Sequence, residues 1–513
     1  MNKFDVIIIG SGLGGLLCGY ILSKEGLNVC ILEKQSQPGG NLQTFTRQGH
    51  KFETGVHYIG ALGPNQTLSR YWNYFGLMDK LHFQQLDPDG FDRVAFGGEE
   101  FPLAQGFENF ADKLLQHFPD ESHSLNEYIR TIHEVVSAFP LYNLELPKDH
   151  REHHYTTQSS YDFLQKLSGT TNCKTQIPYR KSLTGLQSGK IPLSSVLSGN
   201  NYLYGGSPLS PLHVASLINH SFISGAYRII GGSDQVTSAL LQAFALQGGT
   251  IMTKREVTAI GQVHQNFTVT TREGDLFQST MVISDIHPAT TLQMMPADMI
   301  RPAYQKRIAS LQNTASSFIL FMTVKPGSFP YLNYNYYYHT TPDTWNESAT
   351  NDAKWPAMYL LSTGCHRPDQ KFAETITILT YMRYEEVAAW QNSRIGKRGQ
   401  SYLDFKIEKA EKLLNLVSQK FPGLAAAIDH MEVSTPLTYR DYTGIPDGSL
   451  YGIQKNFHEP LLTTVMPRTK IPDFYFTGQN TNLHGVLGVT IGSVVTCGEI
   501  LGLEYLLKKI QNG

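Results

Sequence analysis

Residues 5–34 read DVIIIGSGLGGLLCGYILSKEGLNVCILEK, and this stretch decides the fold of the 513-residue chain. Its apolar run 6–9 is typical of a buried parallel strand, and three glycines follow at G-x-G-x-x-G spacing. Gly10 would permit a tight turn, Gly12 would let the backbone approach a diphosphate, and Gly15 would let the next helix lie close on the strand. We therefore expect this turn to bind the diphosphate of a dinucleotide.

An acidic residue completes the motif. The helix expected from Leu13 ends at Gly26, and a second strand over 28–32 leads to Glu33, roughly 20 residues past the glycines. The N–H groups and positive dipole end of the helix favour a diphosphate. The Glu33 carboxylate can accept hydrogen bonds from both ribose hydroxyls and would repel a 2′-phosphate. The glycines alone are a weak signal, but strand, spacing, helix and acid together predict adenosine with a free ribose rather than NADP.

Composition excludes several classes of protein. The formal net charge is −2 and the basic residues are scattered, so no nucleic-acid partner is expected. The cysteines are few, widely spaced and without metal-ligand spacing, which favours a reducing compartment, no disulfide framework and no metal site. We expect them to pack as small apolar residues. They are Cys18, Cys30, Cys173, Cys365 and Cys497.

The sequence also bears on membranes. No run approaches 18 uninterrupted apolar residues, so no spanning helix is expected. The apolar stretch after Lys3 is not expected to be a secretion signal, because cleavage near Cys18 would destroy the nucleotide-binding unit. We therefore expect a cytoplasmic protein that is either soluble or peripheral on a membrane surface.

A dinucleotide domain assembled from three separated pieces is predicted from the pattern of elements. The pieces are 1–63, 227–300 and 441–513, and the intervening segments 64–226 and 301–440 would form a second, substrate-binding domain. In the second and third pieces we expect a helix over 235–247, strands over 250–260, 267–272, 276–284 and 473–479, and a long last helix that runs towards Lys509.

The intervening segments mix amphipathic helices with strands. Helices are expected over 107–118, 125–139 and 401–421, and strands over 317–324, 357–362 and 375–382. Five tyrosines between 331 and 338 either line an apolar channel or pack on a sheet, and sheet packing is favoured.

Several motifs together resemble one known superfamily. Pro38-Gly39-Gly40 follows Glu33, and residues 52–60 read FETGVHYIG. More general matches are Gly231-Gly232 before a helix, residues 282–284 before His287-Pro288, and Thr477-Gly478-Gln479 before the last helix. With these motifs the chain resembles the FAD-dependent phytoene desaturase and carotenoid isomerase superfamily, and more closely its retinol saturase branch. Residues 140–225 and 325–400 carry no match.

The resemblance implies an α/β fold, with a Rossmann-like FAD-binding domain of the amine-oxidase type and an inserted α+β substrate domain. It implies FAD as the cofactor, and non-covalent binding is expected because Cys497 sits well inside the last helix. Many relatives carry an acid where this chain has Gln479, whose amide can still bind ribityl or diphosphate oxygens without repelling them. The residues expected to contact FAD are Gly10, Gly12, Leu13, Gly14, Gly15, Glu33, Lys34, Gly39, Gly40, Asn41, Gly55, Val56, His57, Val257, Ser284, Gly478, Gln479, Gly488 and Val489.

The resemblance further implies a flavoenzyme that acts on carbon–carbon bonds of an apolar polyene or isoprenoid, with saturation as the leading reaction. Desaturation and cis–trans isomerisation remain alternatives. A second reading is an amine or porphyrinogen oxidase, and a distant third is a prenyl-lipid carrier without flavin. Only one dinucleotide motif is present, so the electron donor or acceptor stays open among quinone, oxygen, a redox protein and transiently bound nicotinamide.

Saturation of a double bond needs a proton as well as a hydride, so an acid near the flavin is expected. His57, Tyr58 and His484 are the candidates, although such residues beside glycine-rich turns often only satisfy backbone groups. An apolar substrate favours peripheral membrane contact. The segment 190–225 is one candidate for that contact, and a loop tucked onto the core is the alternative. Its apolar residues are Leu193, Val196, Leu197, Leu203, Leu209 and Leu212.

Overall fold

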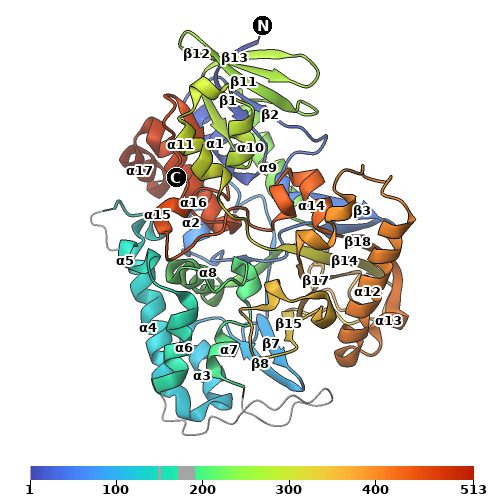
Figure 1. Ribbon diagram of the computed structural model, residues 1–513. Helices are drawn as coiled ribbons and strands as arrows, with labels where there is room; N and C mark the ends of the chain where they lie inside the picture. The colour runs from blue at the N-terminus through green and yellow to red at the C-terminus, as the bar shows by residue number, and fades with distance from the viewer. Residues whose placement is uncertain (1, 148–151, 171–190, 513) are drawn as a thin grey trace.

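Two seven-stranded sheets organise the molecule (Figure 1). The computed structural model describes residues 2–147, 152–170 and 191–512, so Cys173 lies outside the described residues. The first sheet lies at the top of Figure 1, the second at the lower right, and a layer of helices that includes α3 (Phe107–His117), α4 (Ser122–Ala138) and α6 (Ser160–Thr170) at the lower left.

The first sheet has the order β10-β2-β1-β13-β12-β11, with β19 also paired to β13. The strands β10, β2, β1, β13 and β19 run parallel, whereas β13, β12 and β11 form an antiparallel meander. Because β1 is central and covered on both faces, its second half is continuously apolar. The strands are β1 (Asn2–Ile9), β2 (Val29–Leu32), β10 (Thr250–Met252), β11 (Val257–Val263), β12 (Asn266–Thr271), β13 (Leu276–Ser284) and β19 (Phe474–Phe476).

Helices from three distant parts of the chain cover this sheet. α1 (Leu13–Lys24) packs against both α9 (Asp234–Leu246) and α16 (Gly485–Leu501). α16 in turn packs on α17 (Leu503–Asn512), and α17 packs on α2 (Thr67–Tyr74). The first sheet and its helices are therefore built from the beginning, the middle and the end of the sequence.

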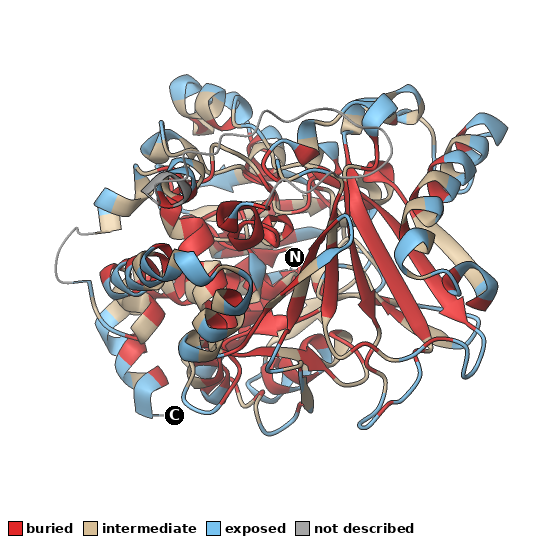
Figure 2. Ribbon diagram, turned by 90° about the horizontal axis from the view of Figure 1, so that it is seen from below, coloured by how far each residue is buried: buried red, intermediate tan, exposed pale blue. Residues whose placement is uncertain are grey.

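The second sheet has the order β18-β14-β17-β16-β15-β7-β8, and its strands β14, β16 and β17 are buried on both faces. Leu360 and Leu379 face a core shared with the helical layer, whereas Tyr359 and Leu361 face a core that includes residues of α12. Figure 2 shows these long strands as buried between helices whose outer faces are exposed. The strands are β7 (Asp92–Phe96), β8 (Glu99–Leu103), β14 (Ser316–Val324), β15 (Asn335–His339), β16 (Met358–Thr363), β17 (Thr375–Met382) and β18 (Ile428–Ser434).

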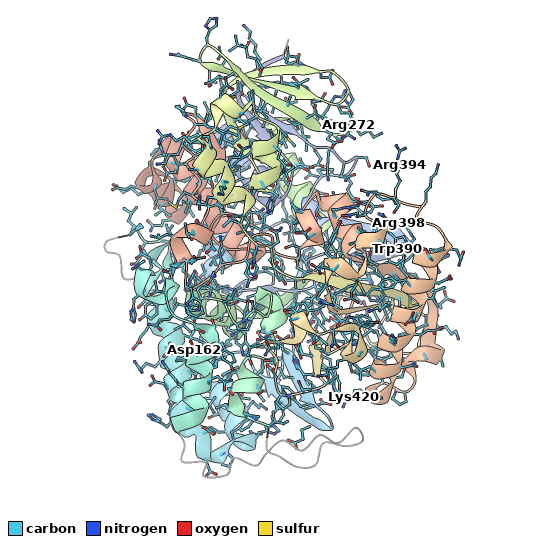
Figure 3. All side chains as sticks on the ribbon, viewed as in Figure 1. Asp162, Arg272, Trp390, Arg394, Arg398 and Lys420 are labelled. Atoms are coloured by element: carbon cyan, nitrogen blue, oxygen red, sulfur yellow. The ribbon has the colours of Figure 1, made fainter. Side chains whose placement is uncertain are left out.

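The remaining elements surround these two sheets. Two small sheets pair β3 (Thr44–Arg47) with β4 (His50–Glu53), and β5 (Ile59–Gly60) and β6 (Phe83–Gln85) with β9 (Ala226–Ile229). The remaining α-helices are α3 (Phe107–His117), α4 (Ser122–Ala138), α5 (Glu152–Thr156), α6 (Ser160–Thr170), α7 (Leu193–Leu197), α8 (Leu212–Ser224), α10 (Pro288–Gln293), α11 (Pro302–Ala309), α12 (Gln400–Lys420), α13 (Leu424–Ala427), α14 (Pro436–Thr443) and α15 (Pro460–Thr463). Arg398, labelled in Figure 3, pairs with Asp441 of α14 and so ties the start of α12 to that helix.

Two expected elements are each divided in the structure. The single strand expected over 250–260 is wrong, because β10 pairs with β2 while β11 pairs with β12, and the chain changes direction between them at Lys254 with φ 54°. The single long last helix is also wrong, since Gly502 with φ 93° separates α16 from α17.

Most of the apolar residues considered for membrane contact are buried. Leu193, Val196 and Leu197 of α7 and Leu212 of α8 belong to buried core clusters, so these side chains pack on the core, although in helices rather than in a loop. Leu203 and Leu209 are half-buried. Within the described residues, no helix combines the length and apolarity needed to cross a bilayer. The four described cysteines are free and buried, as expected.

The cohesion of the first sheet and its helices can be tested on α9. Leu240 is 0% exposed and Leu246 is 82% exposed on the same helix. Leu240→Ala should lower the free energy of unfolding by about 2–5 kcal/mol, because it leaves a cavity between helix and sheet. Leu246→Ala should change it by less than about 0.5 kcal/mol. Chemical denaturation of both variants measures the difference, and equal losses would contradict the packing described here.

Candidate functional site

A cavity, here called the main cavity, lies between the two sheets. It contains about 1940 Å³ of empty space, its open mouth included. One wall is formed by the carboxyl ends of β1 and β2 and the turns that follow them, and another wall includes Leu360 of β16 and Leu379 of β17. Crevices at the carboxyl ends of parallel strands are the usual ligand sites of such sheets.

The glycine turn brings the N-terminus of α1 to this wall. Gly10 adopts φ +97°, which a residue with a side chain rarely does, and so lets the chain turn from β1 into α1. A Cβ on Gly15 would lie 2.3 Å from the carbonyl oxygen of Gly10, so only glycine permits α1 to lie this close to β1. The N–H groups at the start of α1 therefore face the cavity, where they can bind an anion.

Glu33 is held in place by hydrogen bonds at the end of β2. Its Oε2 accepts hydrogen bonds from the Ser11 backbone N–H at 3.0 Å and from the Ser11 hydroxyl at 2.6 Å. Its Oε1 accepts a hydrogen bond from the Gln35 backbone N–H at 2.7 Å. These three bonds orient the carboxylate at the cavity wall and leave Oε1 capacity for one further donor. Ser11, which the sequence analysis did not single out, is thus part of the site.

Asp285 is a second buried acid that the sequence analysis missed. It follows β13, and its carboxyl lies between the turn before α1 and the C-terminal loop, since a Cβ on Gly12 or on Gly478 would approach its oxygens to 2.6 and 2.2 Å. Burial raises the pKa of Asp285 to about 7, although the N–H groups of Gly15 and Gly12 favour its charged form. Asp285 directly follows a buried strand in the sequence, and this position was the feature that could have identified it as a site residue.

Residues 52–60, here called the strap, cross from the first sheet to the second. Glu53 accepts a hydrogen bond from the Ser233 backbone N–H at 3.0 Å, which ties the strap to the start of α9. Phe52 packs on Phe321 of β14 with ring centroids 5.8 Å apart, and β5 pairs with β9. The strap therefore has fixed positions at both ends, and its residues Val56, His57 and Tyr58 line the main cavity between them.

The two histidines considered as acids are both neutral in this environment. Burial lowers the pKa of His57 to about 4, with the Arg228 charge adding to the effect, and burial lowers the pKa of His484 to about 4. His57 Nε2 has no hydrogen-bond partner among the described residues. His484 does not line the cavity; its Nε2 donates to the Leu203 carbonyl at 3.0 Å and its ring stacks on Tyr451. A backbone-satisfying role therefore accounts for His484.

The C-terminal loop closes the cavity near the glycine turn. Gln479 Oε1 accepts a hydrogen bond from Asn41 Nδ2 at 3.3 Å, which joins this loop to the segment after Gly39 and Gly40. Of the residues expected to contact a cofactor, most line the main cavity. They are Gly10, Gly12, Leu13, Gly14, Glu33, Lys34, Gly39, Gly40, Asn41, Gly55, Val56, His57, Val257, Gly478, Gln479 and Val489.

Three expected contact residues lie outside the lining. Gly15 serves the packing of α1 on β1, and a Cβ on Gly488 would meet Leu483 at 2.8 Å, so that glycine serves the turn before α16. Ser284 is fully buried, and its hydroxyl shares a 2.7 Å hydrogen bond with the Thr291 hydroxyl. Local packing explains the glycine or serine at each of these positions.

The main cavity has a charged end and an uncharged end. Its charged lining residues all follow strands of the first sheet, namely Glu33, Lys34, Arg255, Glu256 and Asp285. The described lining residues towards the second sheet are aromatic or aliphatic and carry no charge. They include Tyr202, Leu203, Leu360, Leu379, Tyr439, Leu450 and Tyr451, which the sequence analysis did not identify. One end therefore suits a polar nucleotide and the other suits an apolar molecule.

No metal site is evident in the part of the chain that the structure describes, since no three His, Cys, Asp or Glu side chains there are grouped to hold an ion.

Comparison with known proteins agrees with this geometry. The family described as an NAD(P)-binding Rossmann-like domain matches residues 8–75. All-trans-retinol 13,14-reductase of Danio rerio is 26% identical, over 100% of this chain and 89% of that protein. Carotenoid 3,4-desaturase of Haloarcula japonica is 24% identical, over 69% of this chain and 71% of that protein.

Among solved structures, cyclohexylamine oxidase from Brevibacterium oxydans superposes with a TM-score of 0.59 at 14% identity, over 99% of each chain. This likeness confirms the predicted α/β fold with its Rossmann-like domain of the amine-oxidase type. Over its full length the chain thus resembles the FAD-dependent phytoene desaturase and carotenoid isomerase superfamily, and within it the retinol saturase branch, as its motifs predicted.

Proposed function

We propose that this protein is an FAD-dependent oxidoreductase that acts on carbon–carbon double bonds of an apolar polyene, with saturation as its leading reaction. The observation that carries the proposal is the charge division of the main cavity, whose nucleotide-binding end continues past the strap into an uncharged aromatic and aliphatic end. Full-length similarity to an all-trans-retinol 13,14-reductase supports a retinoid or carotenoid as the class of substrate.

The residues present fit FAD. The start of α1 would hold the diphosphate, Glu33 the adenosine ribose, and the strap with the C-terminal loop the flavin ring. One buried polar atom in the lining, His57 Nε2, has no hydrogen-bond partner among the described residues, as expected where a polar ligand belongs. None of the described cysteines lines the main cavity, which supports non-covalent binding.

When bound, reduced FAD supplies a hydride to one carbon of the double bond. The chain supplies the rest. Leu360, Leu379 and Tyr451 exclude water around the polyene, and Tyr58, a lining residue from the strap, carries a hydroxyl. That hydroxyl is the group we assign as proton donor to the second carbon.

The alternative of an amine or porphyrinogen oxidase fits less well. Amines and porphyrinogen carboxylates are charged, and a buried charge needs a charged or hydrogen-bonding partner. The described lining residues at the second sheet provide no such charge. Desaturation and isomerisation fit the same cavity, and a relative named as a carotenoid 3,4-desaturase keeps desaturation open. Membrane contact, which would give access to a lipid-dissolved substrate, is also part of the proposal.

The cofactor assignment predicts a yellow protein with one FAD per chain. Glu33→Arg should lose bound FAD, because the guanidinium can neither accept the ribose hydrogen bonds nor receive those from Ser11 and Gln35. Glu33→Gln should retain part of the FAD. Flavin absorbance per protein measures both, and Glu108→Arg, an exposed change on α3, is the control. Retention of full FAD by Glu33→Arg would refute the ribose assignment, and colourless native protein would favour the carrier alternative.

The reaction can be assigned by anaerobic half-reactions. Dithionite-reduced enzyme should be re-oxidised by all-trans-retinol or a carotenoid, with a product heavier by two hydrogen atoms. A product of unchanged mass and altered geometry would instead indicate an isomerase, and re-oxidation by none of these polyenes would refute the proposal. Leu379→Trp narrows the apolar end and should slow re-oxidation by about tenfold or more while FAD content is unchanged.

A further inference from the structure

A buried acid lies directly behind the strap. Asp92 is the first residue of β7 and is 0% exposed. No basic side chain forms an ion pair with it among the described residues. A buried carboxyl without a partner cation is costly when ionised, so its presence calls for an explanation.

Hydrogen bonds connect Asp92 to the wall of the main cavity. The Tyr58 hydroxyl donates to Asp92 Oδ2 at 3.0 Å and also shares a 2.8 Å hydrogen bond with the hydroxyl of Tyr337 on β15. Asn335 Nδ2 donates to Asp92 Oδ1 at 3.0 Å, and Asn200 Nδ2 donates to Oδ2 at 3.3 Å. Since Tyr58 lines the main cavity, one residue separates the Asp92 carboxyl from that cavity.

A buried cation stands behind this network. Arg228 of β9 is almost fully buried and donates to Asn335 Oδ1 at 2.9 Å, so one amide separates its guanidinium from Asp92. Burial raises the pKa of Asp92 to about 7, while its hydrogen bonds and the Arg228 charge hold that pKa from rising further. The titratable or charged groups that face Asp92 are Tyr58 of the strap, Tyr337 of β15 and Arg228 of β9.

We propose that Asp92 supplies the proton that the Tyr58 hydroxyl delivers to the second carbon of the substrate double bond. This inference rests on the proposed function. The Tyr58 O–H bond breaks as the new C–H bond forms, and the Asp92 carboxyl passes its own proton to the Tyr58 oxygen. The hydride and its two electrons come from the FAD, reduced beforehand by a two-electron donor. Asp92 is left as a carboxylate and regains a proton from solvent.

The electrostatics require the two residues to act together. Burial, with Asp92 and Tyr337 adding to it, raises the pKa of Tyr58 well above its ordinary value. A Tyr58 phenolate is therefore unfavourable here, and its proton can leave only as another arrives. Neutral Asp92 donates to the Tyr58 oxygen and frees the Tyr58 proton for the substrate. Ionised Asp92 instead accepts a hydrogen bond from the Tyr58 hydroxyl, so the Tyr58 proton is not available to the substrate.

A route for the returning proton lies on the other side of the strap. A second, smaller cavity, here called the strap cavity, is lined by polar groups that include Lys51, Glu53, Arg228 and His366. Residues 56–58, with His57 and Tyr58 among them, line both cavities. Water in the strap cavity can therefore reach Tyr58, the hydrogen-bond partner of Asp92, without passing through the apolar end of the main cavity.

The decisive variant is Asp92→Asn, which keeps the shape of the side chain and the hydrogen bond from Asn335 but carries no transferable proton. The measurement is re-oxidation of dithionite-reduced holoenzyme by all-trans-retinol as a function of pH. The native rate should fall as pH rises through about 7, because the donating form of Asp92 is the protonated one. Asp92→Asn should be slower by about 100-fold or more and should lack this pH dependence.

Two further variants separate proton supply from structure. Tyr58→Phe should slow re-oxidation as Asp92→Asn does and retain FAD. Tyr381→Phe removes another buried tyrosine hydroxyl, which has no hydrogen-bond partner among the described residues and no link to Asp92, and should leave the rate unchanged. A native pH profile in Asp92→Asn, or an equal loss of rate in Tyr381→Phe, would overturn the proposal.

Infrared difference spectra provide a test without substrate. A carboxyl C=O band should disappear as the pH of native holoenzyme rises through about 7, and that band should be missing in Asp92→Asn. Persistent ionisation of Asp92 well below neutral pH would overturn the proposal. If retinol fails to re-oxidise the native enzyme but the band titrates as expected, the proposed function fails while the proton-supplying pair stands.

Discussion

The packing of α1 on β1 is the contact on which the rest of the structure depends. With glycine at position 15, the helix lies close enough to the strand for its N-terminal N–H groups to reach the main cavity. A single methyl group there would press on the carbonyl oxygen of Gly10 and push the helix away. The absence of a side chain at Gly14 leaves room for Asp285 and Gly478, so the C-terminal loop can meet the N-terminal turn. Residues almost 470 positions apart thus form one wall because Gly14 and Gly15 have no side chains.

The strap gives that wall a second function. Its beginning is held by Ser233 at the start of α9, and its end pairs with β9, so residues 56–58 are fixed between the two sheets. One face of this segment lines the main cavity, and the other lines the strap cavity. Because Tyr58 also bonds Asp92, the strap joins the nucleotide site, the apolar site and a buried acid within a few residues. In the proposed enzyme, a segment placed this way would supply both a dry boundary beside the flavin and a proton.

Local sequence patterns predicted those helices and strands that have a regular hydrophobic periodicity and clear turn residues at their ends. The expected strands and helices of the first sheet are present around residues 5–34 and 235–284. Continuous apolar runs there indicate buried elements, and glycines mark where those elements end. The prediction of one strand over 250–260 failed, because the first part of this segment pairs with β2 and the second part pairs with β12. The pairing partners, and not the β propensity of the residues, divide the segment into two strands. The tyrosines at 336 and 338 pack against Tyr359 on the sheet, as favoured, whereas Tyr337 points to the opposite face and to Tyr58.

By itself, the sequence determined the prediction of a nucleotide end, because G-x-G-x-x-G, Glu33 and the strap motif all lie within residues 10–60 and their chemistry depends on spacing along the chain. Only the tertiary structure decided the apolar end and the acid behind it. Leu360, Tyr451 and Asp92 come from segments without a shared motif, and each is an ordinary residue in its own strand or loop. Their roles arise from burial and from neighbours distant in sequence, and these are properties that no local pattern contains.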